Sequence, residues 1–417
     1  MQITLAVAGD WRTFTTDDVL APYIYVFYAA FLVSFAFTPI MRIVAQYYGI
    51  VDQPDSARKI HTAPVAYLGG VAVFLGWICG LAISQLTGMH DSLAGLTHVQ
   101  IPFALVLGAF VTVTLGLWDD VRKISPRTKI LGQLLAATFL LSQGIGNHAI
   151  DAIIGPLNHR LYYHLGFSIP HWISVVLGAG FVYFVVVGCC NATNLMDGLD
   201  GLCGGVTAVI AGGFLFLAIT IARFSGGYHP NDDALRIVLG LALLGAVLGF
   251  VPYNFNPASI FMGDAGSMLL GFASATMILL SAQGTHSKWF LASMVMFALP
   301  VLDTALAFAR RFVKGRPIFS ADQNHFHHQM VARGFSVKQT VMISYGLAIF
   351  FALCGGMITY MRTRYAMCFY LVIFGSISVA AYKLGMVHEQ VKEKLPAKPT
   401  ESIANSPAPE PVGSGSI

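Results

Sequence analysis

Residues 236–282 read RIVLGLALLGAVLGFVPYNFNPASIFMGDAGSMLLGFASATMILLSA, and this stretch decides the fold. Two apolar runs, 236–253 and 264–282, stand on either side of a short link that contains Asn, Pro, Ser and Gly. Each run is close to the roughly 20 residues that an α-helix needs to cross the hydrocarbon core of a bilayer. The stretch therefore predicts two consecutive membrane-spanning helices joined by a polar connection.

The rest of the chain repeats this pattern. Of its 417 residues, 56% are hydrophobic and only 11% are charged, whereas a soluble domain of this length would expose far more charge. The apolar runs are 21–45, 66–86, 100–118, 130–146, 172–190, 201–222, 236–253, 264–282, 288–309, 340–361 and 365–384. Because the fourth run is short, ten or eleven spans are expected. The predicted fold is an all-α, polytopic integral membrane helical bundle.

The basic residues predict the orientation of this bundle. With eleven spans, alternate connections divide the 24 Lys and Arg residues into 17 on one side and 7 on the other. The positive-inside rule assigns the richer side to the cytoplasm, so we expect the N-terminus outside and the C-terminus inside. Arg362 and Arg364 fall on the outer side, as exceptions to the bias. Residues 1–20 lack the pattern of a cleavable signal peptide, so the first span is interpreted as an uncleaved anchor.

Three regions are expected along the chain. Residues 1–20 form a short external segment, residues 21–385 form one polytopic domain, and the Pro-, Ser- and Glu-containing residues 386–417 form a disordered cytoplasmic tail. The outer connections, of which 147–171 is the longest, are expected to be irregular and solvated. The six cysteines show no metal-type spacing and are interpreted as free, small apolar residues.

Acids and histidines gather on the predicted cytoplasmic face. The clusters are Asp119-Asp120, Asn194-x-x-Asp197-x-x-Asp200, Asp264, Asp303, and Asp322 with His325-x-His327-His328. A secondary transporter would instead place ionisable residues near the bilayer midplane, at broken helices in related halves. Polar clusters on one face predict one active site that opens to one compartment, which favours an enzyme.

The adjacent carboxylates Asp119 and Asp120 repel each other, so a divalent cation, basic groups or a proton must compensate them. Solvated charges at a helix end are the alternative.

In the next cluster, Asn194, Asp197 and Asp200 recur at every third position and would share one face of a helical turn. That spacing indicates a ligand site, with a structural loop as the alternative.

Asp264 begins a predicted helix between glycines, where outward-pointing N–H groups suit a phosphate and the carboxylate can hold a metal beside it. An N-cap aspartate in a glycine turn is the alternative. Phe261 either stacks on a base or packs in the core. Asp303 lies inside the ninth run, where an ionisable residue is expected to be functional or paired, in this chain with Arg310 or Arg311.

The histidines His325, His327 and His328 follow a basic segment that contains Arg311. Three histidines in four positions invite a zinc site, but adjacent His327 and His328 cannot both face one ion from a regular helix. Hydrogen bonds to a pyrophosphate explain the histidines equally well, and the basic residues fit phosphate binding. The motif therefore favours phosphate chemistry over zinc.

Five stretches together resemble the polyprenyl-phosphate N-acetylhexosamine-1-phosphate transferase family, also known as glycosyltransferase family 4. They are RKIHTAPVAYLGG (58–70), Asp119-Asp120 with Lys129 and Gln133, NATNLMDGLDGL (191–202), NFNPASIFMGDAGS (254–267) and DTALAFARRFVKGRPIFSADQNHFHH (303–328). The form of the histidine motif is similar to that of the N-acetylglucosaminyl branch. Gln323 departs from many relatives, which have Arg after the aspartate, and this leaves the sugar open.

The resemblance implies transfer of N-acetylhexosamine 1-phosphate, with GlcNAc expected, from a UDP-sugar to undecaprenyl phosphate, with Mg²⁺ as cofactor and Mn²⁺ as a substitute. It implies a multi-pass protein of the bacterial cytoplasmic (inner) membrane with a cytoplasmic active site, acting at the first membrane step of a cell-envelope polysaccharide such as O-antigen. The phospho-MurNAc-pentapeptide transferase of peptidoglycan synthesis is the alternative. Membrane lipid is an expected partner, nucleic acid is not, and a homodimer stays open.

The resemblance also implies roles for individual residues. Asp264, supported by Asp120, is expected to bind the metal, and Asp119 to orient or deprotonate the lipid phosphate, whose second pKa is about 6. The histidines His325, His327 and His328 complete the expected catalytic group. The expected substrate-binding residues are Lys59, Lys129, Asn194, Asp197, Asp200, Phe261 and Arg311.

Overall fold

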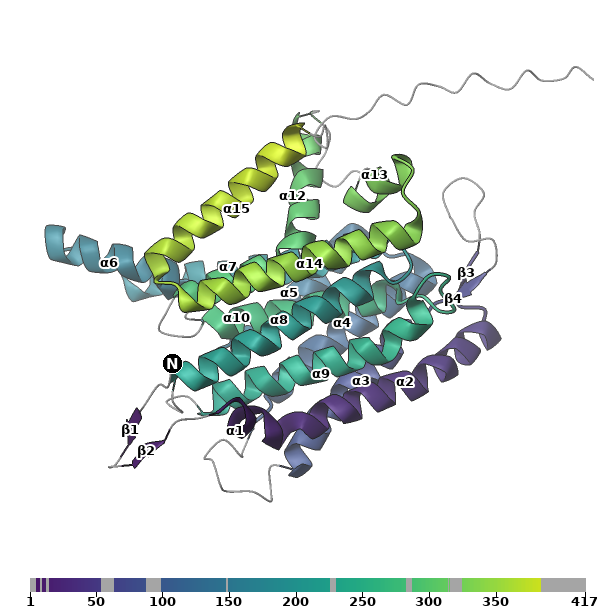
Figure 1. Ribbon diagram of the computed structural model, residues 1–417, viewed down its shortest axis with the longest axis horizontal. Helices are drawn as coiled ribbons and strands as arrows, with labels where there is room; N and C mark the ends of the chain where they lie inside the picture. Colours follow the sequence, from purple (N-terminus) through teal and green to yellow (C-terminus); the bar gives the residue numbers. More distant parts are fainter. Residues whose placement is uncertain are drawn as a thin grey trace, which may run out of the picture.

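The computed structural model describes residues 5–7, 10–12, 15–53, 64–87, 99–147, 149–225, 230–282, 287–313, 315 and 325–383. Within them the chain is a bundle of long helices that lie side by side, with two small antiparallel hairpins (Figure 1). The strands are β1 (Leu5–Val7), β2 (Asp10–Arg12), β3 (Val51–Asp52) and β4 (Val65–Ala66). The helices are α1 (Thr16–Leu20), η1 (Ala21–Tyr23), α2 (Ile24–Tyr47), α3 (Gly69–Thr87), α4 (Phe103–Arg122), α5 (Pro126–Ser142), α6 (Asp151–Leu165), α7 (His171–Met196), α8 (Leu202–Ser225), α9 (Pro230–Asn254), α10 (Gly263–Ala282), α11 (Ser287–Met296), α12 (Ala298–Val313), α13 (Phe326–Ala332), α14 (Val337–Tyr360) and α15 (Thr363–Lys383).

The helical, membrane-type fold predicted from the sequence is confirmed. Eight helices in the described part of the chain are long and apolar enough to cross a membrane, or nine if the bent pair α11–α12 is one span. Each of the eleven apolar runs overlaps a helix, but α5 is not among these candidate spans and α15 counts only as a shorter apolar helix, Thr363–Ile377. The number of spans and their orientation stay predictions. The predicted tail, residues 386–417, lies outside the described residues.

The ninth apolar run is not one straight helix, as the sequence analysis expected. It breaks between Met296 and Ala298, and α11 and α12 meet at 74°. Pro300 explains the break, because it has no N–H to donate to the Met296 carbonyl and its ring would clash with that carbonyl in a continuous helix. As a result α12 leaves the bundle, and Figure 1 shows it rising away from the other long helices.

The outer connection 147–171 also differs from the irregular loop that was expected. It contains α6, which points away from the bundle at the end opposite α13 (Figure 1). Gly166 ends this helix in the left-handed conformation, at φ 65°, and its N–H bonds the Tyr162 carbonyl. This is a common helix stop.

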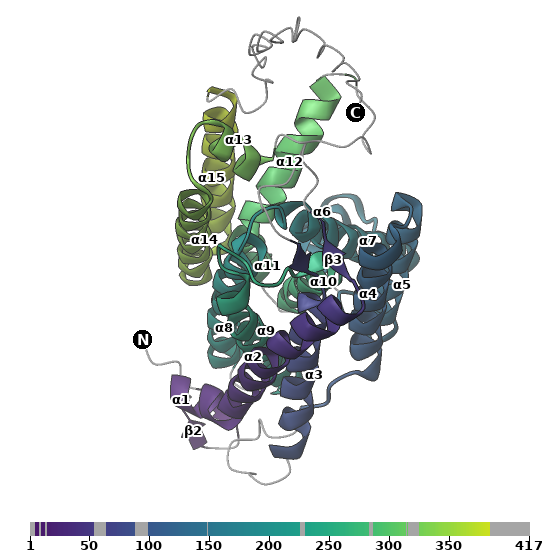
Figure 2. The same ribbon diagram turned by 90° about the vertical axis from the view of Figure 1, so that its right-hand side faces the viewer.

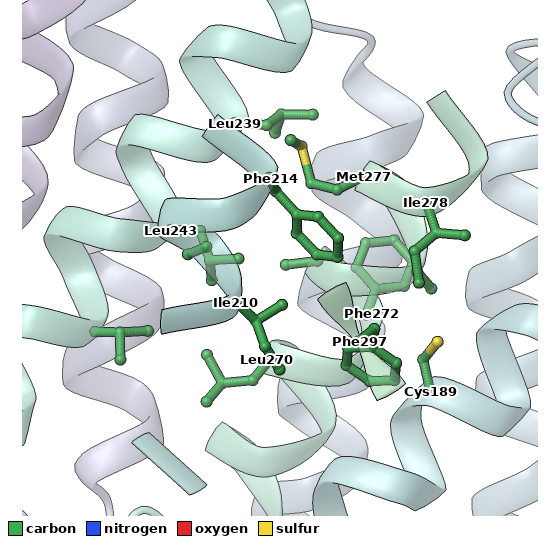
Figure 3. Packing of buried hydrophobic residues seen from close by; sticks show 14 of the residues in the cluster. Cys189, Ile210, Phe214, Leu239, Leu243, Leu270, Phe272, Met277, Ile278 and Phe297 are labelled. Carbon is green, nitrogen blue, oxygen red and sulfur yellow. The ribbon is translucent and has the colours of Figure 1, made fainter. Parts of the chain in front are cut away.

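Helix α10 lies at the centre of the bundle and is buried along its whole length. Figure 3 shows Phe272 and Ile278 of α10 among Phe214 of α8, Leu243 of α9 and Phe297. Small residues in the neighbouring helices allow this close packing: a Cβ at Gly108 of α4 would lie 2.6 Å from the Phe272 ring. The helix whose first turn carries Asp264 is therefore held on all sides by protein.

The ends of four helices meet where the site forms. Helix α4 stops at Lys123, which has the left-handed φ of 48°, and α5 starts three residues later with Ser125 as its N-cap, accepting the Thr128 N–H. These ends face the end of α7 and the start of α10. The β3–β4 hairpin covers the same end of the bundle (Figures 1 and 2), and Ala66 forms a parallel bridge with Ile260.

Candidate active site

Lys129 joins the two carboxylates on which the sequence analysis concentrated. Its ammonium lies 2.8 Å from Oδ2 of Asp119 and also pairs with Oδ2 of Asp264. The other oxygen of Asp119 accepts the Ile124 N–H at 2.8 Å. Residues from α4, α5 and α10 therefore form one cluster, in which a cation compensates two acids that would otherwise repel each other.

Asn194, at the end of α7, holds the same aspartate from the other side. Its Nδ2 donates to Oδ1 of Asp264 at 2.8 Å and to Oγ of Ser267 at 3.0 Å. Thr193 adds a hydrogen bond from its hydroxyl to the Ser267 carbonyl at 2.8 Å. Both oxygens of Asp264 are thus bound to groups of the protein, and these contacts favour a role for Asn194 in positioning Asp264; contact with uridine stays a prediction.

Asp120 faces away from Lys129 and toward the N-terminus of α10. Its Oδ1 accepts the N–H of Asp264 at 2.8 Å, and its Oδ2 accepts the N–H of Ala265 at 3.2 Å. The helix start at which the sequence analysis expected a phosphate therefore already has a carboxylate on its first N–H groups. The two adjacent acids of α4 have different partners.

Asp197 ends α7 beside these groups and is half-buried. Burial, with the charges of Asp264, Asp120 and Asp200 in support, raises the pKa of Asp197 to about 8. A carboxyl group in this position is mostly protonated at neutral pH, so it can donate as well as accept a hydrogen bond. This property suits recognition of a nucleobase or ribose.

Asp200 fastens the loop that leads to α10. Its Oδ2 accepts from Nδ2 of Asn256 at 2.9 Å and from the N–H of Ala258 at 3.0 Å, next to the cis peptide Asn256–Pro257. Asn254 adds a second link, from the Gly201 N–H to its Oδ1 and from its Nδ2 to the Ile260 carbonyl. The segments 197–201 and 254–261 are therefore one bonded unit.

Phe261 lies beside a residue that the sequence analysis did not select, Tyr67. The two ring centroids are 6.1 Å apart. Burial raises the pKa of Tyr67, and the charge of Asp52 and a hydrogen bond to it act in the same direction. The sequence could have indicated Tyr67, because it is the aromatic residue two positions before Gly69-Gly70 in the first matching stretch. Both rings are half-buried and form one side of the site.

Asp303 anchors the histidine segment. Its Oδ2 lies 3.1 Å from Nδ1 of His325, and its Oδ1 accepts the N–H of Phe326, which begins α13, at 2.7 Å. The partners that the structure gives to Asp303 are thus His325 and Phe326, where the sequence analysis expected Arg310 or Arg311. Arg311 lies with its guanidinium 5.9 Å from the ring centroid of Phe308.

His327 connects the histidine segment to the loop 197–201. A Cβ on Gly198 would lie 2.3 Å from its Nε2, so only glycine allows this approach. Burial, and then the charge of His328, lowers the pKa of His327 to about 3, so the ring is neutral. Its Nε2 is buried and, among the described residues, has no hydrogen-bond partner. The ring centroids of His327 and His328 are 4.3 Å apart.

The structure thus brings together most of the predicted site residues: Asp119, Asp120, Lys129, Asn194, Asp197, Asp200, Phe261, Asp264, His325, His327 and His328. Lys59 and residues 316–324, which include Asp322 and Gln323, lie outside the described residues. Within the described ranges no three His, Cys, Asp or Glu side chains are placed to hold a metal ion by themselves. Asp119 and Asp264 do offer the hard oxygen donors that Mg²⁺ prefers, and Mg²⁺ usually takes only one or two carboxylates, with substrate phosphates as further ligands.

Comparison with known proteins gives consistent matches. Residues 102–282 match the model of glycosyl transferase family 4. The chain is 30% identical, over 90% of its length and 96% of the relative, to a probable undecaprenyl-phosphate N-acetylglucosaminyl 1-phosphate transferase of Bacillus subtilis (strain 168). It is 34% identical, over 76% of its length and 77% of the relative, to a decaprenyl-phosphate N-acetylglucosaminephosphotransferase of Mycobacterium tuberculosis. An undecaprenyl-phosphate alpha-N-acetylglucosaminyl 1-phosphate transferase of Escherichia coli (strain K12) is 29% identical over 88% of this chain and 93% of its own length.

Proposed function

Because this chain belongs to the polyprenyl-phosphate N-acetylhexosamine-1-phosphate transferase family (glycosyl transferase family 4), we propose that it transfers N-acetylglucosamine 1-phosphate from UDP-GlcNAc to undecaprenyl phosphate. One observation carries this proposal. Asp119, Lys129 and Asp264 meet at the ends of apolar helices, where a lipid phosphate and a water-soluble nucleotide sugar can both reach them. A site for phosphoryl transfer needs positioning and charge neutralisation, which carboxylates beside a lysine supply.

The membrane arrangement is part of the same proposal. Eleven spans, with the N-terminus outside and the C-terminus inside, would direct this site to the cytoplasm of a bacterial cell, where the basic residues concentrate. Asp119, Lys129 and Asp264 lie at helix ends and not at mid-helix, which supports an enzyme over a transporter. The chain would then act on the inner leaflet of the cytoplasmic membrane.

The chemistry is a single displacement at phosphorus. An oxygen of undecaprenyl phosphate attacks the sugar-bearing β-phosphorus of UDP-GlcNAc and forms the new P–O bond. The bond from that phosphorus to the bridging oxygen breaks, and its electron pair leaves with UMP. Asp119 would orient the attacking phosphate or accept its remaining proton, and Lys129 is placed to neutralise phosphate charge once substrates enter.

Asp264 is the proposed ligand of Mg²⁺, with Mn²⁺ as a substitute. Bound there, the ion would neutralise charge on the pyrophosphate of the donor. The protein holds Asp264 ready through Lys129 and Asn194, one on each carboxylate oxygen. Those contacts fix the direction of the carboxylate before substrate arrives, which is what a positioned ligand requires.

The nucleotide would lie along the loop 197–201 and Phe261. The protonated carboxyl of Asp197 can donate to a carbonyl of uracil, and the half-buried ring of Phe261 can stack on the base. Asp200 would contribute by holding Asn256 and Ala258 in place. The neutral His327, together with His325, His328 and Arg311, would contact the pyrophosphate or the sugar.

The direct test is an assay of the purified chain in detergent with undecaprenyl phosphate, Mg²⁺ and a panel of UDP-sugars. The panel contains UDP-GlcNAc, UDP-GalNAc and UDP-MurNAc-pentapeptide, and UMP release is followed with the lipid product identified by mass. We expect release with UDP-GlcNAc and inhibition by tunicamycin. Asp264→Asn, which keeps the shape of the side chain, is the inactive control. Release of UMP with UDP-MurNAc-pentapeptide alone would assign the chain to peptidoglycan synthesis, and no release with any donor would refute the proposal.

A further inference from the structure

We propose that Asp120 is a positioning residue that caps the start of α10 and sets the direction of Asp264, and that it is not a metal ligand. The inference rests on the proposed function and deepens it. It separates the two adjacent acids, Asp119 and Asp120, into one that faces the substrates and one that faces the protein.

The first argument is the use of the carboxylate. The first four N–H groups of a helix have no partner inside the helix and need another acceptor. Asp120 supplies acceptors to two of them, with Oδ1 on the Asp264 N–H at 2.8 Å and Oδ2 on the Ala265 N–H at 3.2 Å. The cap comes from a different helix, 144 residues earlier in the chain. Both oxygens therefore accept backbone N–H groups of α10, which cannot move aside for an ion as the side chains of Lys129 and Asn194 at Asp264 can.

The second argument is the close approach of α4 to α10. Gly263 has φ 70°, and a Cβ on it would lie 2.5 Å from Oδ2 of Asp120. Gly116 lies one turn before Asp120 on the same face of α4, and a Cβ there would lie 2.4 Å from the Ala265 Cα. The carboxylate and this glycine thus hold the first turn of α10 at two points, and neither glycine accepts a larger residue.

The third argument is the direction of the neighbouring acid. Successive residues on a helix point about 100° apart. Asp119 therefore faces Lys129 while Asp120 faces α10. The repulsion between adjacent carboxylates is reduced because each has its own positive partner: an ammonium for Asp119, and for Asp120 the positive end of the α10 dipole.

The experiment separates positioning from metal binding. Asp120→Asn and Asp120→Ala are made in the full-length chain, with kcat, KM for UDP-GlcNAc and the Mg²⁺ concentration for half-maximal rate measured for each. We expect kcat to fall on the order of 100-fold in Asp120→Ala, because a misplacement of about 1 Å costs that much. Asp120→Asn should lose less, since its amide oxygen still accepts one N–H. The KM for UDP-GlcNAc should stay within about twofold of the wild-type value, as it must if only the transition state loses stabilisation. A rise in the half-maximal Mg²⁺ concentration should appear only together with faster amide exchange at Asp264 and Ala265, because a displaced Asp264 also holds the ion less tightly.

Hydrogen exchange gives a readout that needs no turnover. The amides of Asp264 and Ala265 should exchange faster in both variants than in the wild type, because their acceptor is weakened or removed. Ser336→Ala is the matched control: Ser336 caps α14 through the Gln339 N–H, away from the cluster, so its loss should lower thermal stability and leave kcat unchanged. If Asp120→Ala does not fold, the kinetic and exchange measurements on Asp120→Asn decide the proposal.

Two results would overturn the inference. One is a variant whose half-maximal Mg²⁺ concentration rises tenfold or more while exchange at Asp264 and Ala265 stays at the wild-type rate, which would identify Asp120 as a ligand. The other is unchanged kcat together with unchanged exchange at Asp264 and Ala265. If the wild-type chain releases no UMP, the proposed function fails, whereas the exchange measurement still decides whether Asp120 caps α10.

Discussion

The Nδ1 of His325 lies 3.1 Å from Oδ2 of Asp303, and the second oxygen of the same carboxylate accepts the backbone N–H of Phe326. One buried acid in α12 therefore fixes both the first histidine of the motif and the start of the helix that carries the other two. An acid at Nδ1 also fixes the orientation of the ring and favours a proton on Nδ1, the nitrogen that faces the carboxylate.

Replacing Asp303 by Asn should lower kcat by about 10- to 100-fold, the usual effect of losing a carboxylate that orients a functional histidine. The amide can still accept the Phe326 N–H, so the protein should remain folded. UMP release and thermal unfolding in detergent measure the two effects. Thr304→Ala is the control, since that hydroxyl bonds only the Pro300 carbonyl of its own helix. Equal rates for Asp303→Asn and Thr304→Ala would contradict the assignment.

The pKa of Asp197, raised to about 8, predicts how stability depends on pH. The folded chain keeps a proton on this carboxyl between about pH 4 and pH 8, whereas the unfolded chain releases it, so stability is lost as pH rises through that range. The slope is at most about 1.4 kcal/mol per pH unit. Melting curves without divalent ions at pH 5 and pH 8 should therefore differ more for the wild type than for Asp197→Asn, which cannot titrate. Parallel shifts in the two proteins would disprove a raised pKa.

Gly70→Ala should disrupt the contact between α3 and α10. Its Cβ would lie 2.1 Å from the backbone N of Gly266, and backbone atoms cannot move aside cheaply. We expect a loss of more than about 1–3 kcal/mol, as for overpacking in a core, together with reduced activity, because Asp264 lies in the same turn. Gly212→Ala in α8 is the matched control, since no atom within 4 Å would meet its Cβ. That variant should be as stable as the wild type or more stable. If both variants unfold at the same temperature, the close approach is not as tight as described.

Removing one side of the ion pair between Asp233 and Arg236 should destabilise the protein strongly. Nη1 of Arg236 lies 2.6 Å from Oδ1 of Asp233, both side chains are buried, and Nε of the arginine donates to the Leu280 carbonyl near the end of α10. Arg236→Met removes the cation beside the buried Asp233 carboxylate and should cost about 3–5 kcal/mol. The double variant Asp233→Asn/Arg236→Met should recover much of that loss in thermal unfolding. A double variant no more stable than Arg236→Met would show that the loss of stability does not come from the buried charge of Asp233.

The fold was largely predictable because its determinants are local. Length and apolarity alone identify a membrane helix, so every predicted run falls on helix. The meeting of Asp119, Asn194 and Asp264 was also foreseeable, since alternate connections of such a bundle lie at the same end. The break at Phe297 had a visible signal in Pro300 that was not used.

The partners of individual carboxylates were not predictable. In the sequence Asp120 looks like a metal ligand and Asp200 like a substrate ligand. Their oxygens instead accept the backbone N–H groups of Asp264 and Ala258, on segments far away in the chain. The partners of Asp303, His325 and Phe326, lie 22 and 23 positions further along the chain. The partner of each carboxylate is decided by tertiary packing, and it cannot be predicted from the spacing of residues within a motif.

Helix α10 is surrounded by protein on every side, so the acyl chains of the bilayer do not touch the span of the helix that carries Asp264. A change in bilayer thickness acts first on helices that face the acyl chains, such as α2, whose exposed face bears Leu32 and Ile43. The reacting centre is thus mechanically insulated from the membrane in which its lipid substrate dissolves. Such a chain can work in membranes of different composition without retuning the geometry of its carboxylates.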